Sequence, residues 1–308
     1  CLNQDGRMPG IPLQRAQIKP IGQHFELFRI EIDDRDVVVF GDETGGNRGP
    51  YLTGAQDNDF SHCFCLMQHS LFAQAINVFA LNKEVLVANK LAVANKDPKK
   101  LASYNVLIEL ANKSLQFKPG SVVEKLNTPP SGDKHDYMSL APYWWPDPSS
   151  KNGLPYIRKD GEVNPEVGNY PDKQNMPRVC EKVYEFSLAF YLSGNETYAK
   201  KARALVHTWF LDTATKMNPN VNYGQAVKGV VEGRGEGLID TRHFIFLLDG
   251  VQLLNKSKSW STNDNNELKI WFKAYYDWLD NSKIGKDEKK ASNNHGVWYD
   301  AQALAITN

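Results

Sequence analysis

The sequence has no excess of charge of either sign. Its 308 residues include 36 Lys and Arg against 36 Asp and Glu. Proteins that bind nucleic acid usually carry a strong basic excess, so this balance argues against a nucleic-acid partner. An acidic polymer can still bind, but only where basic side chains gather in one cleft.

Cysteine is scarce, with four residues in the whole chain. So few cysteines in a chain of this length do not predict a disulfide framework. Cys63 and Cys65 are too close together, and without further partners, to indicate a zinc site. Cys180 lies in an apolar helical pattern, which predicts a core position. We therefore predict no metal site.

Long apolar runs are also missing. No stretch reaches the roughly 18 apolar residues of a transmembrane helix, so the sequence predicts no membrane span. Hydrophobic residues make up 41% of the chain and charged residues 23%, which is normal for a globular protein with a sizeable core. Residues 67–80 either resemble the end of a signal peptide, with small residues at Ala73 and Ala75, or form an apolar linker into the first helix.

Residues 1–74 differ from the rest of the chain in their pattern of apolar and polar residues. Apolar and polar residues alternate over residues 24–46, which indicates one or two short strands. This segment is either a small β unit or not part of the natural mature protein. We assign residues 75–308 to a single helical domain.

From Ile76 onward the sequence predicts helices joined by long loops. Gly194 and Asn195 end one helix and cap the next, which predicts a hairpin with a very short turn. Antiparallel helix pairs without intervening strands indicate an all-α fold, here an (α/α) toroid. The pairs are too few to close a toroid, so we expect an incomplete one, truncated at its C-terminus. The predicted helical segments are residues 101–117, 176–194, 195–211, 240–254 and 263–282.

Two long loops, residues 128–166 and 217–243, interrupt the helices. Loops of this length are usually functional or disordered, and their aromatic content argues against disorder. In the first loop, Tyr143, Trp144 and Trp145 lie between two prolines that stiffen the backbone. Rigid aromatic rings suit stacking on sugar rings, although either tryptophan could instead cover the core.

The second loop contains alternating glycines in the stretch EGRGEG, residues 232–237. Their spacing excludes a phosphate-binding loop and indicates a close approach of backbone to a ligand or to another chain segment. Arg242 either clamps a carboxylate with two hydrogen bonds or pairs with Asp240 or Glu236. His243 is either a core histidine or a site residue.

The stretch SNNHG, residues 292–296, begins the last predicted helix. Ser292 or Asn293 caps it, and the N-terminus of a helix favours a bound anion. Asn294 then offers amide donors beside the imidazole of His295. Removal of a proton next to a carboxylate needs both a neutralised carboxylate and a base within reach. The plainer alternative is a structural histidine.

Four segments resemble the alginate lyase domain family of bacterial polysaccharide lyases: residues 135–148, 153–166, 237–254 and 293–306. The resemblance covers about Ile76 to the chain end. It implies an (α/α) toroid, a periplasmic or secreted location, and β-elimination on a uronic acid polymer. No metal or organic cofactor is implied, since elimination next to a neutralised carboxylate needs neither.

The resemblance also implies roles for single residues. The family's active-site Asn–His pair maps onto Asn294 and His295, where Asn294 helps to neutralise the C6 carboxylate and His295 is the base or assists it. The family's aromatic loop, near Tyr137 to Trp145 here, lines the cleft. Its general-acid tyrosine lies downstream of Asn308. Arg242 matches no family residue and rests on its chemistry alone.

We therefore predict a polysaccharide lyase that acts on alginate or a related polyuronate, with an acidic polysaccharide as its partner. One alternative is a glycoside hydrolase, for which Glu232, Glu236 and Asp240 are candidate carboxylates. The other is a non-catalytic protein that binds uronates. The predicted catalytic residues are Asn294 and His295, and the predicted substrate-binding residues are Tyr137, Tyr143, Trp144, Trp145, Arg242 and His243.

Overall fold

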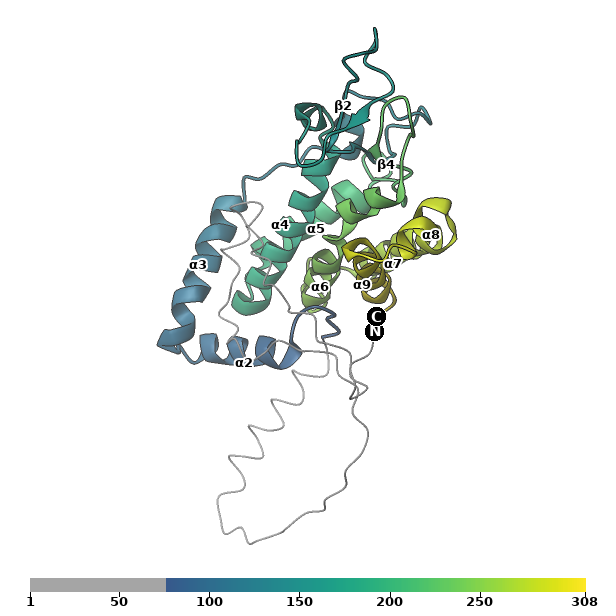
Figure 1. Ribbon diagram of the computed structural model, residues 1–308. Coiled ribbons are helices and arrows are strands. Elements are labelled where there is room, and N and C mark those ends of the chain that lie inside the picture. The colour runs from purple at the N-terminus through teal and green to yellow at the C-terminus, as the bar shows by residue number, and fades with distance from the viewer. Residues whose placement is uncertain (1–75) are drawn as a thin grey trace, which may run out of the picture. The chain divides into compact units, whose positions relative to one another are not determined.

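The computed structural model describes residues 76–308. Eight α-helices and four short strands make up this part of the chain (Figure 1). The strands predicted within residues 24–46, most of the signal-like stretch and the domain boundary at residue 74 lie outside the described residues. Within them, the predicted all-α class is confirmed. No helix here combines the length and the apolar character that a membrane span requires.

The elements have the following bounds. The α-helices are α2 (Lys83–Ala94), α3 (Pro98–Ser114), α4 (Asp172–Ser193), α5 (Glu196–Val206), α6 (Phe244–Leu253), α7 (Thr262–Asn281), α8 (Lys283–Lys289) and α9 (Asn294–Thr307). Short segments of 3-10 helix are η2 (Val122–Glu124), η3 (Pro165–Asn169) and η5 (Gly235–Thr241), and η4 (His207–Leu211) is a π-helical segment. The strands are β1 (Met138–Leu140), β2 (Trp144–Trp145), β3 (Ile157–Arg158) and β4 (Tyr223–Ala226).

The predicted hairpin between α4 and α5 is confirmed. Gly194 ends α4 with a left-handed φ of 72°, which glycine adopts without steric cost. The side chain of Asn195 then accepts a hydrogen bond from the backbone N–H of Thr197 and caps α5. Because the turn is so short, the two helices lie antiparallel and pack along their length.

Helix α4 is the centre of the core. It packs against α5 and α6, and Figure 1 shows the three helices side by side. The approach to α6 is close, since a Cβ at Gly250 would lie 3.0 Å from the Cα of Tyr184. Cys180 is fully buried on α4, as predicted. Beyond α6, an aromatic cluster of Phe210, Phe244, Trp271, Phe272 and Tyr275 joins η4 and α7 to the same core.

The two long loops meet at one end of the helices. Strand β1 of the first loop pairs in parallel with β4 of the second, so that Met138 faces Tyr223 and Leu140 faces Ala226. Strands β2 and β3 pair antiparallel inside the first loop. The sequence analysis predicted neither pairing, because strands of two to four residues are too short to show a period.

A buried ion pair anchors this end to α4. Nζ of Lys125 lies 2.9 Å from Oδ2 of Asp172, and each side chain is only 1% exposed. The ammonium also donates to the carbonyls of Val122 and Lys134. Asp172 accepts a further hydrogen bond from the backbone N–H of Met138. The start of β1 is therefore tied to the first turn of α4.

The glycines of the second loop allow two backbone segments to touch. A Cβ at Gly237 would lie 2.5 Å from the carbonyl carbon of Gly224, and one at Gly233 would overlap the carbonyl oxygen of Asn222. The predicted close approach of the backbone is thus confirmed, and the backbone approaches another segment of the chain. This contact between Gly237 and Gly224 packs η5 against β4.

We expect Gly237→Ala to lower the free energy of unfolding by roughly 1–3 kcal/mol, because the added methyl group would overlap the backbone of Gly224. Urea denaturation of the variant and the wild type measures the change. Gly168→Ala is the control, since a Cβ there would meet nothing within 4 Å. Equal destabilisation by both substitutions would contradict this account of the packing.

Candidate active site

His295 lies in the first turn of α9, and Glu288 of α8 holds its imidazole ring. Nδ1 of His295 is 2.6 Å from Oε1 of Glu288. The His295 side chain is 20% exposed, whereas that of Glu288 is 3% exposed. Burial raises the pKa of Glu288, and the hydrogen bond from His295 opposes this shift. No residue among 76–308 hydrogen-bonds to Nε2 of His295, the other ring nitrogen.

The neighbours of His295 shape the start of α9. Asn293 is the N-cap, as predicted, and its side chain accepts a hydrogen bond from the backbone N–H of His295. A Cβ at Gly296 would overlap the carbonyl oxygen of Ala291, so only glycine fits this tight reversal between α8 and α9. Asn294 is exposed beside the free N–H groups of the first turn.

Arg234 lies close to the His295–Glu288 pair. Its Nε and Nη2 donate to the backbone and side-chain oxygens of Gln225, and its Nη1 donates to Glu236 at 2.8 Å. Burial lowers the pKa of this guanidinium, and the nearby charges of Glu236 and Glu288 oppose the shift. The sequence analysis missed Arg234, although it stands between the glycines of the EGRGEG stretch.

The aromatic loop reaches the same region through Arg158. The guanidinium of Arg158 is exposed and donates to Oδ1 of Asp160 at 2.7 Å, and its positive charge contributes to the lowered pKa of Arg234. Arg158 is the strand partner of Trp144 in the β2–β3 pair. Charge interactions therefore link Arg158 to Arg234 and Arg234 to Glu288, and Glu288 hydrogen-bonds to His295. We call Arg158, Gln225, Arg234, Glu288 and His295 the polar cluster.

The three aromatic residues of this loop differ in their surroundings. Trp144 packs partly against a small core of Ala141, Tyr156 and Val227. The indole N–H of Trp145 donates to the carbonyl of Glu162, and the ammonium of Lys159 lies 5.1 Å from its ring centroid. Tyr143 is the most open, at 37% exposed. Covering the core is thus part of the role of Trp144, while Tyr143 and Trp145 lie outside the core clusters of the described residues.

Tyr137 lies beneath the site. It is fully buried, and its hydroxyl donates to Oδ2 of Asp240 at 3.0 Å. Ser139 and Gln225 donate to the same carboxylate, which joins β1, β4 and η5. Burial and the negative charge of Asp240 raise the pKa of Tyr137. The predicted contact between Tyr137 and substrate would need the side chain to become exposed, so its position indicates a supporting role.

Gln225 occupies an unusual backbone conformation in this network. Its φ of 47° is left-handed, which is uncommon for a residue other than glycine. Such conformations persist where surrounding contacts over-determine them, and they cluster at functional sites. Here the hydrogen bonds to Ser139, Asp240 and Arg234 hold the residue.

The predicted residues Arg242 and His243 are not brought to the polar cluster. Nη1 of Arg242 donates to the carbonyl of Ile239, and neither Asp240 nor Glu236 is its partner among the contacts of the described chain. His243 is 4% exposed, with Nδ1 3.7 Å from Oε1 of Glu181. Burial and the adjacent Arg242 lower the pKa of His243 to about 4. Of the two alternatives for His243, the structure favours the core histidine.

The carboxylates that a glycoside hydrolase would need are engaged elsewhere. Asp240 accepts hydrogen bonds on both of its oxygens, and Glu236 pairs with Arg234. Glu232 is exposed. The described residues contain no group of three or more side chains suited to hold a metal ion.

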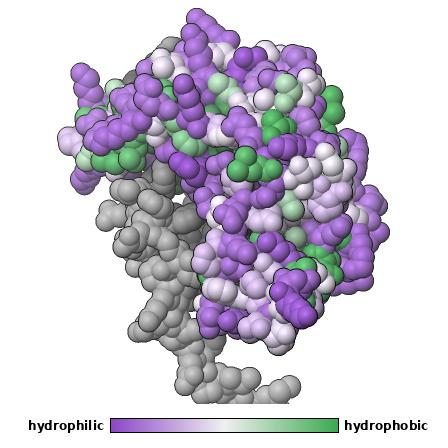
Figure 2. Space-filling model, turned by 90° about the horizontal axis from the view of Figure 1, so that it is seen from above, coloured by the Kyte–Doolittle hydropathy of each residue, from purple (hydrophilic) through white to green (hydrophobic). Residues whose placement is uncertain are grey.

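The end of the molecule that carries β2, β4 and α8 faces the viewer in Figure 2. Its surface is mostly hydrophilic, with small apolar patches between polar side chains. Such a surface suits a hydrated, charged ligand better than a large apolar one.

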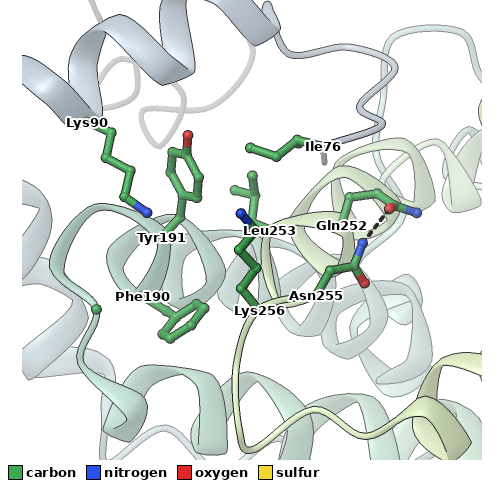
Figure 3. A pocket seen from close by; sticks show the side chains of 9 residues that line it. Ile76, Lys90, Phe190, Tyr191, Gln252, Leu253, Asn255 and Lys256 are labelled. Atoms are coloured by element: carbon green, nitrogen blue, oxygen red, sulfur yellow. Dashed lines mark hydrogen bonds between the residues drawn. The ribbon is translucent and has the colours of Figure 1, made fainter. Parts of the chain in front are cut away.

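Two pockets lie elsewhere. One, of about 60 Å³, has Lys90 and Lys256 pointing into it beside Tyr191 (Figure 3). The other, of about 520 Å³, lies between α6, α7, α9 and residues 77–79. Neither is lined by a predicted site residue or by a member of the polar cluster.

Antiparallel helices that pack side by side, with two paired loops at one end, are consistent with the (α/α) toroid class. The sequence model of the family described as alginate lyase matches residues 121–307. The chain therefore belongs to the alginate lyase family, as the sequence predicted.

A solved structure supports the same conclusion. The crystal structure of an alginate lyase from Bacteroides ovatus is 40% identical, with a TM-score of 0.72 over 75% of this chain and 61% of that chain. This similarity confirms the predicted toroid fold class. The chain spans 61% of the length of that lyase. No curated protein matches the chain.

His243 should make the stability of the folded protein depend on pH. Its pKa falls from 6.5 to about 4 on folding, so between these values the unfolded chain binds a proton that the folded protein does not. The free energy of unfolding should therefore decrease as the pH is lowered from about 6.5 towards 4, and His243→Gln should remove roughly 1–3 kcal/mol of that decrease. Urea denaturation across this pH range measures it. Identical pH profiles for variant and wild type would sink the prediction.

Proposed function

We propose that this protein is a polysaccharide lyase that cleaves alginate or a related polyuronate by β-elimination. One observation carries the proposal: Glu288 holds Nδ1 of His295 at the N-terminus of α9 and leaves Nε2 without a partner among the described residues. An imidazole whose second nitrogen is open can accept a proton from a bound substrate. Membership of the alginate lyase family supports this assignment.

The proposed reaction begins at the C6 carboxylate of a uronate residue. The amide of Asn294 and the free N–H groups of the α9 first turn reduce its negative charge, which makes the neighbouring C5–H bond more acidic. Nε2 of His295 takes the C5 proton or orients the group that does. The electron pair of that bond forms a C4–C5 double bond, and the C4–O bond breaks. The leaving oxygen takes a proton from a general acid that we do not assign.

Binding of an acidic polymer needs positive side chains that gather locally, because the net charge of the whole chain is zero. Arg234, whose charge interacts with that of Glu288, and the exposed Arg158, which pairs with Asp160, supply this positive charge, and Lys159 lies over the ring of Trp145. We propose that Arg234 holds a substrate carboxylate, in place of the predicted Arg242. Tyr143 and Trp145 present aromatic faces on which sugar rings can stack.

We also propose a periplasmic or secreted location. Support comes from the chemistry of the proposed substrate, since a large charged polymer does not cross a lipid bilayer unaided. Fractionation of the native cells with an antibody against the chain tests it, and a signal confined to the cytoplasm would exclude it.

Incubation with polymannuronate, polyguluronate and glucuronan tests the proposed reaction. We expect at least one polymer to give products with the ultraviolet absorbance of a C4–C5 double bond. His295→Ala should lower kcat by about 10²–10⁴-fold, because it removes the proposed base or its orienting group. The control is Lys286→Ala, an exposed position on the neighbouring α8. Cleavage that yields only saturated products would indicate a hydrolase instead.

Arg234→Lys should raise KM about tenfold and leave kcat less affected, because lysine keeps the charge and loses the two-pronged geometry that matches a carboxylate. Steady-state kinetics on the best polymer measures both constants. Arg178→Lys is the matched control, since Arg178 is exposed on α4 and lies over the ring of Phe117, away from the polar cluster. An unchanged KM for Arg234→Lys would contradict substrate binding by this residue.

A further inference from the structure

We propose that Glu288 is a positioning residue for the reaction: its carboxylate keeps a proton on Nδ1 of His295 and thereby leaves the lone pair of Nε2 available to the substrate. The mechanistic half of this inference rests on the proposed function. The half that concerns the proton on His295 can be tested without any lyase activity.

The contact itself determines where the imidazole proton lies. Oε1 of Glu288 is 2.6 Å from Nδ1, and an ionised carboxylate can only accept a hydrogen bond. Nδ1 must therefore carry a proton, and in a neutral ring Nε2 is then the acceptor. The His295 side chain is 20% exposed, and Glu288 is its hydrogen-bond partner at Nδ1, so a substrate that reaches the ring would meet Nε2 without a partner among the described residues. Partners of this kind fix the tautomer and orientation of working histidines.

The backbone around Glu288 holds the carboxylate in place. A Cβ at Gly235 would lie 3.1 Å from its N and 3.3 Å from its Oε2, so η5 presses directly on it. Its own carbonyl accepts a hydrogen bond from the N–H of Ala291, which sets the turn into α9. At the other end of α8, Gly285 fits against the carbonyl of Leu279, where a Cβ would overlap it. Glu288 thus projects inward from a short helix fixed on both sides.

Several groups face this carboxylate from the elements packed around it. Arg234, which precedes η5, lowers the pKa of Glu288, and Glu236 of η5 raises it, while His295 of α9 is its hydrogen-bond partner. From α7, the phenol of Tyr275 lies close enough for Glu288 to raise its pKa. The positive charge of Arg234 favours the ionised carboxylate, which is the form that can hold the proton on Nδ1. Arg234 is also the proposed partner of the substrate carboxylate. The residue that neutralises the substrate therefore also favours the charged form of Glu288, which orients His295.

Removal of the carboxylate should free the ring. Isolated histidine prefers the tautomer with its proton on Nε2, and in that form Nε2 has no lone pair for the C5 proton. In Glu288→Gln, the side-chain amide can donate to Nδ1 as well as accept from it, so the tautomer is no longer specified. The change leaves the side chains of Asn294 and Arg234, the proposed carboxylate partners, in the protein.

The first experiment is ¹⁵N NMR of the protein labelled at histidine. We expect the wild type to carry the His295 proton on Nδ1, and Glu288→Gln to show a larger share of the Nε2 form, with His295→Ala used to assign the signal. A wild-type protein with its proton on Nε2 would overturn the proposal directly. The tautomer of the wild type can be measured without lyase activity and without folding of the Glu288→Gln variant, so this result decides the proposal even if the variant is unstable.

The second experiment is kinetics on the best polyuronate. Glu288→Gln should lower kcat by about 10–100-fold and change KM by less than about threefold. Asp287→Asn is the matched control, because it removes the adjacent carboxylate on the same helix, which pairs outward with Lys283, and should leave kcat unchanged. Wild-type kcat in Glu288→Gln, or a loss of kcat without a change of tautomer, overturns the positioning role.

The two proposals fail in different ways. If no polyuronate is cleaved by the wild type, the lyase assignment fails, while the NMR result still decides whether Glu288 sets the tautomer. If the wild type is active and Glu288→Gln leaves the tautomer of His295 unchanged, the lyase assignment stands and the proposed role of Glu288 is wrong.

Discussion

The carboxylate of Asp240 is the constraint on which the candidate site depends. It is buried and accepts hydrogen bonds from Tyr137 and Ser139 of the first long loop and from Gln225 of the second. A buried carboxylate without such partners would be costly, so these contacts favour one arrangement of the loops. The parallel pairing of β1 with β4 and the position of Gln225 follow from it. Gln225 in turn holds Arg234 beside Glu288 and His295.

The charge distribution explains how a chain without net charge can serve an acidic polymer. Arg158 and Arg234 belong to the two long loops that meet at one end of the helices; Asp160 pairs with Arg158, and Glu236 pairs with Arg234, whose charge Glu288 also opposes. This neutralised arrangement lets the arginines approach without a large repulsive cost. In the proposed function, a substrate carboxylate would replace one of these internal partners. Local grouping of charge, and not the overall balance, therefore decides what the surface can bind.

Prediction from the sequence succeeded where local chemistry dominates. Gly194 and Asn195 mark the α4–α5 turn because a left-handed C-terminus and an N-cap depend on neighbouring residues alone. The cap at Asn293 was predictable for the same reason. Helix α8 was missed, since seven residues rich in lysine show no apolar period, and Glu288 was missed with it. The sequence analysis assigned a role to Arg242 and none to Arg234, because the contacts of Arg234 with Gln225 and Glu236 form only when the second loop folds.

The sequence by itself determined the helical class, the capped start of α9 with Asn294 and His295, and the resemblance to alginate lyases, because these depend on residue order over short spans. Only the tertiary structure decided which side chains surround His295. Glu288 comes from a separate helix, Arg234 from a loop about 60 residues earlier, and their meeting depends on backbone contacts at Gly235 and Gly237 that have no local signature. Burial decided two further residues, because the sequence does not display it: Tyr137, which was predicted to bind substrate, is internal, and His243, for which a core and a site position were both open, is also internal.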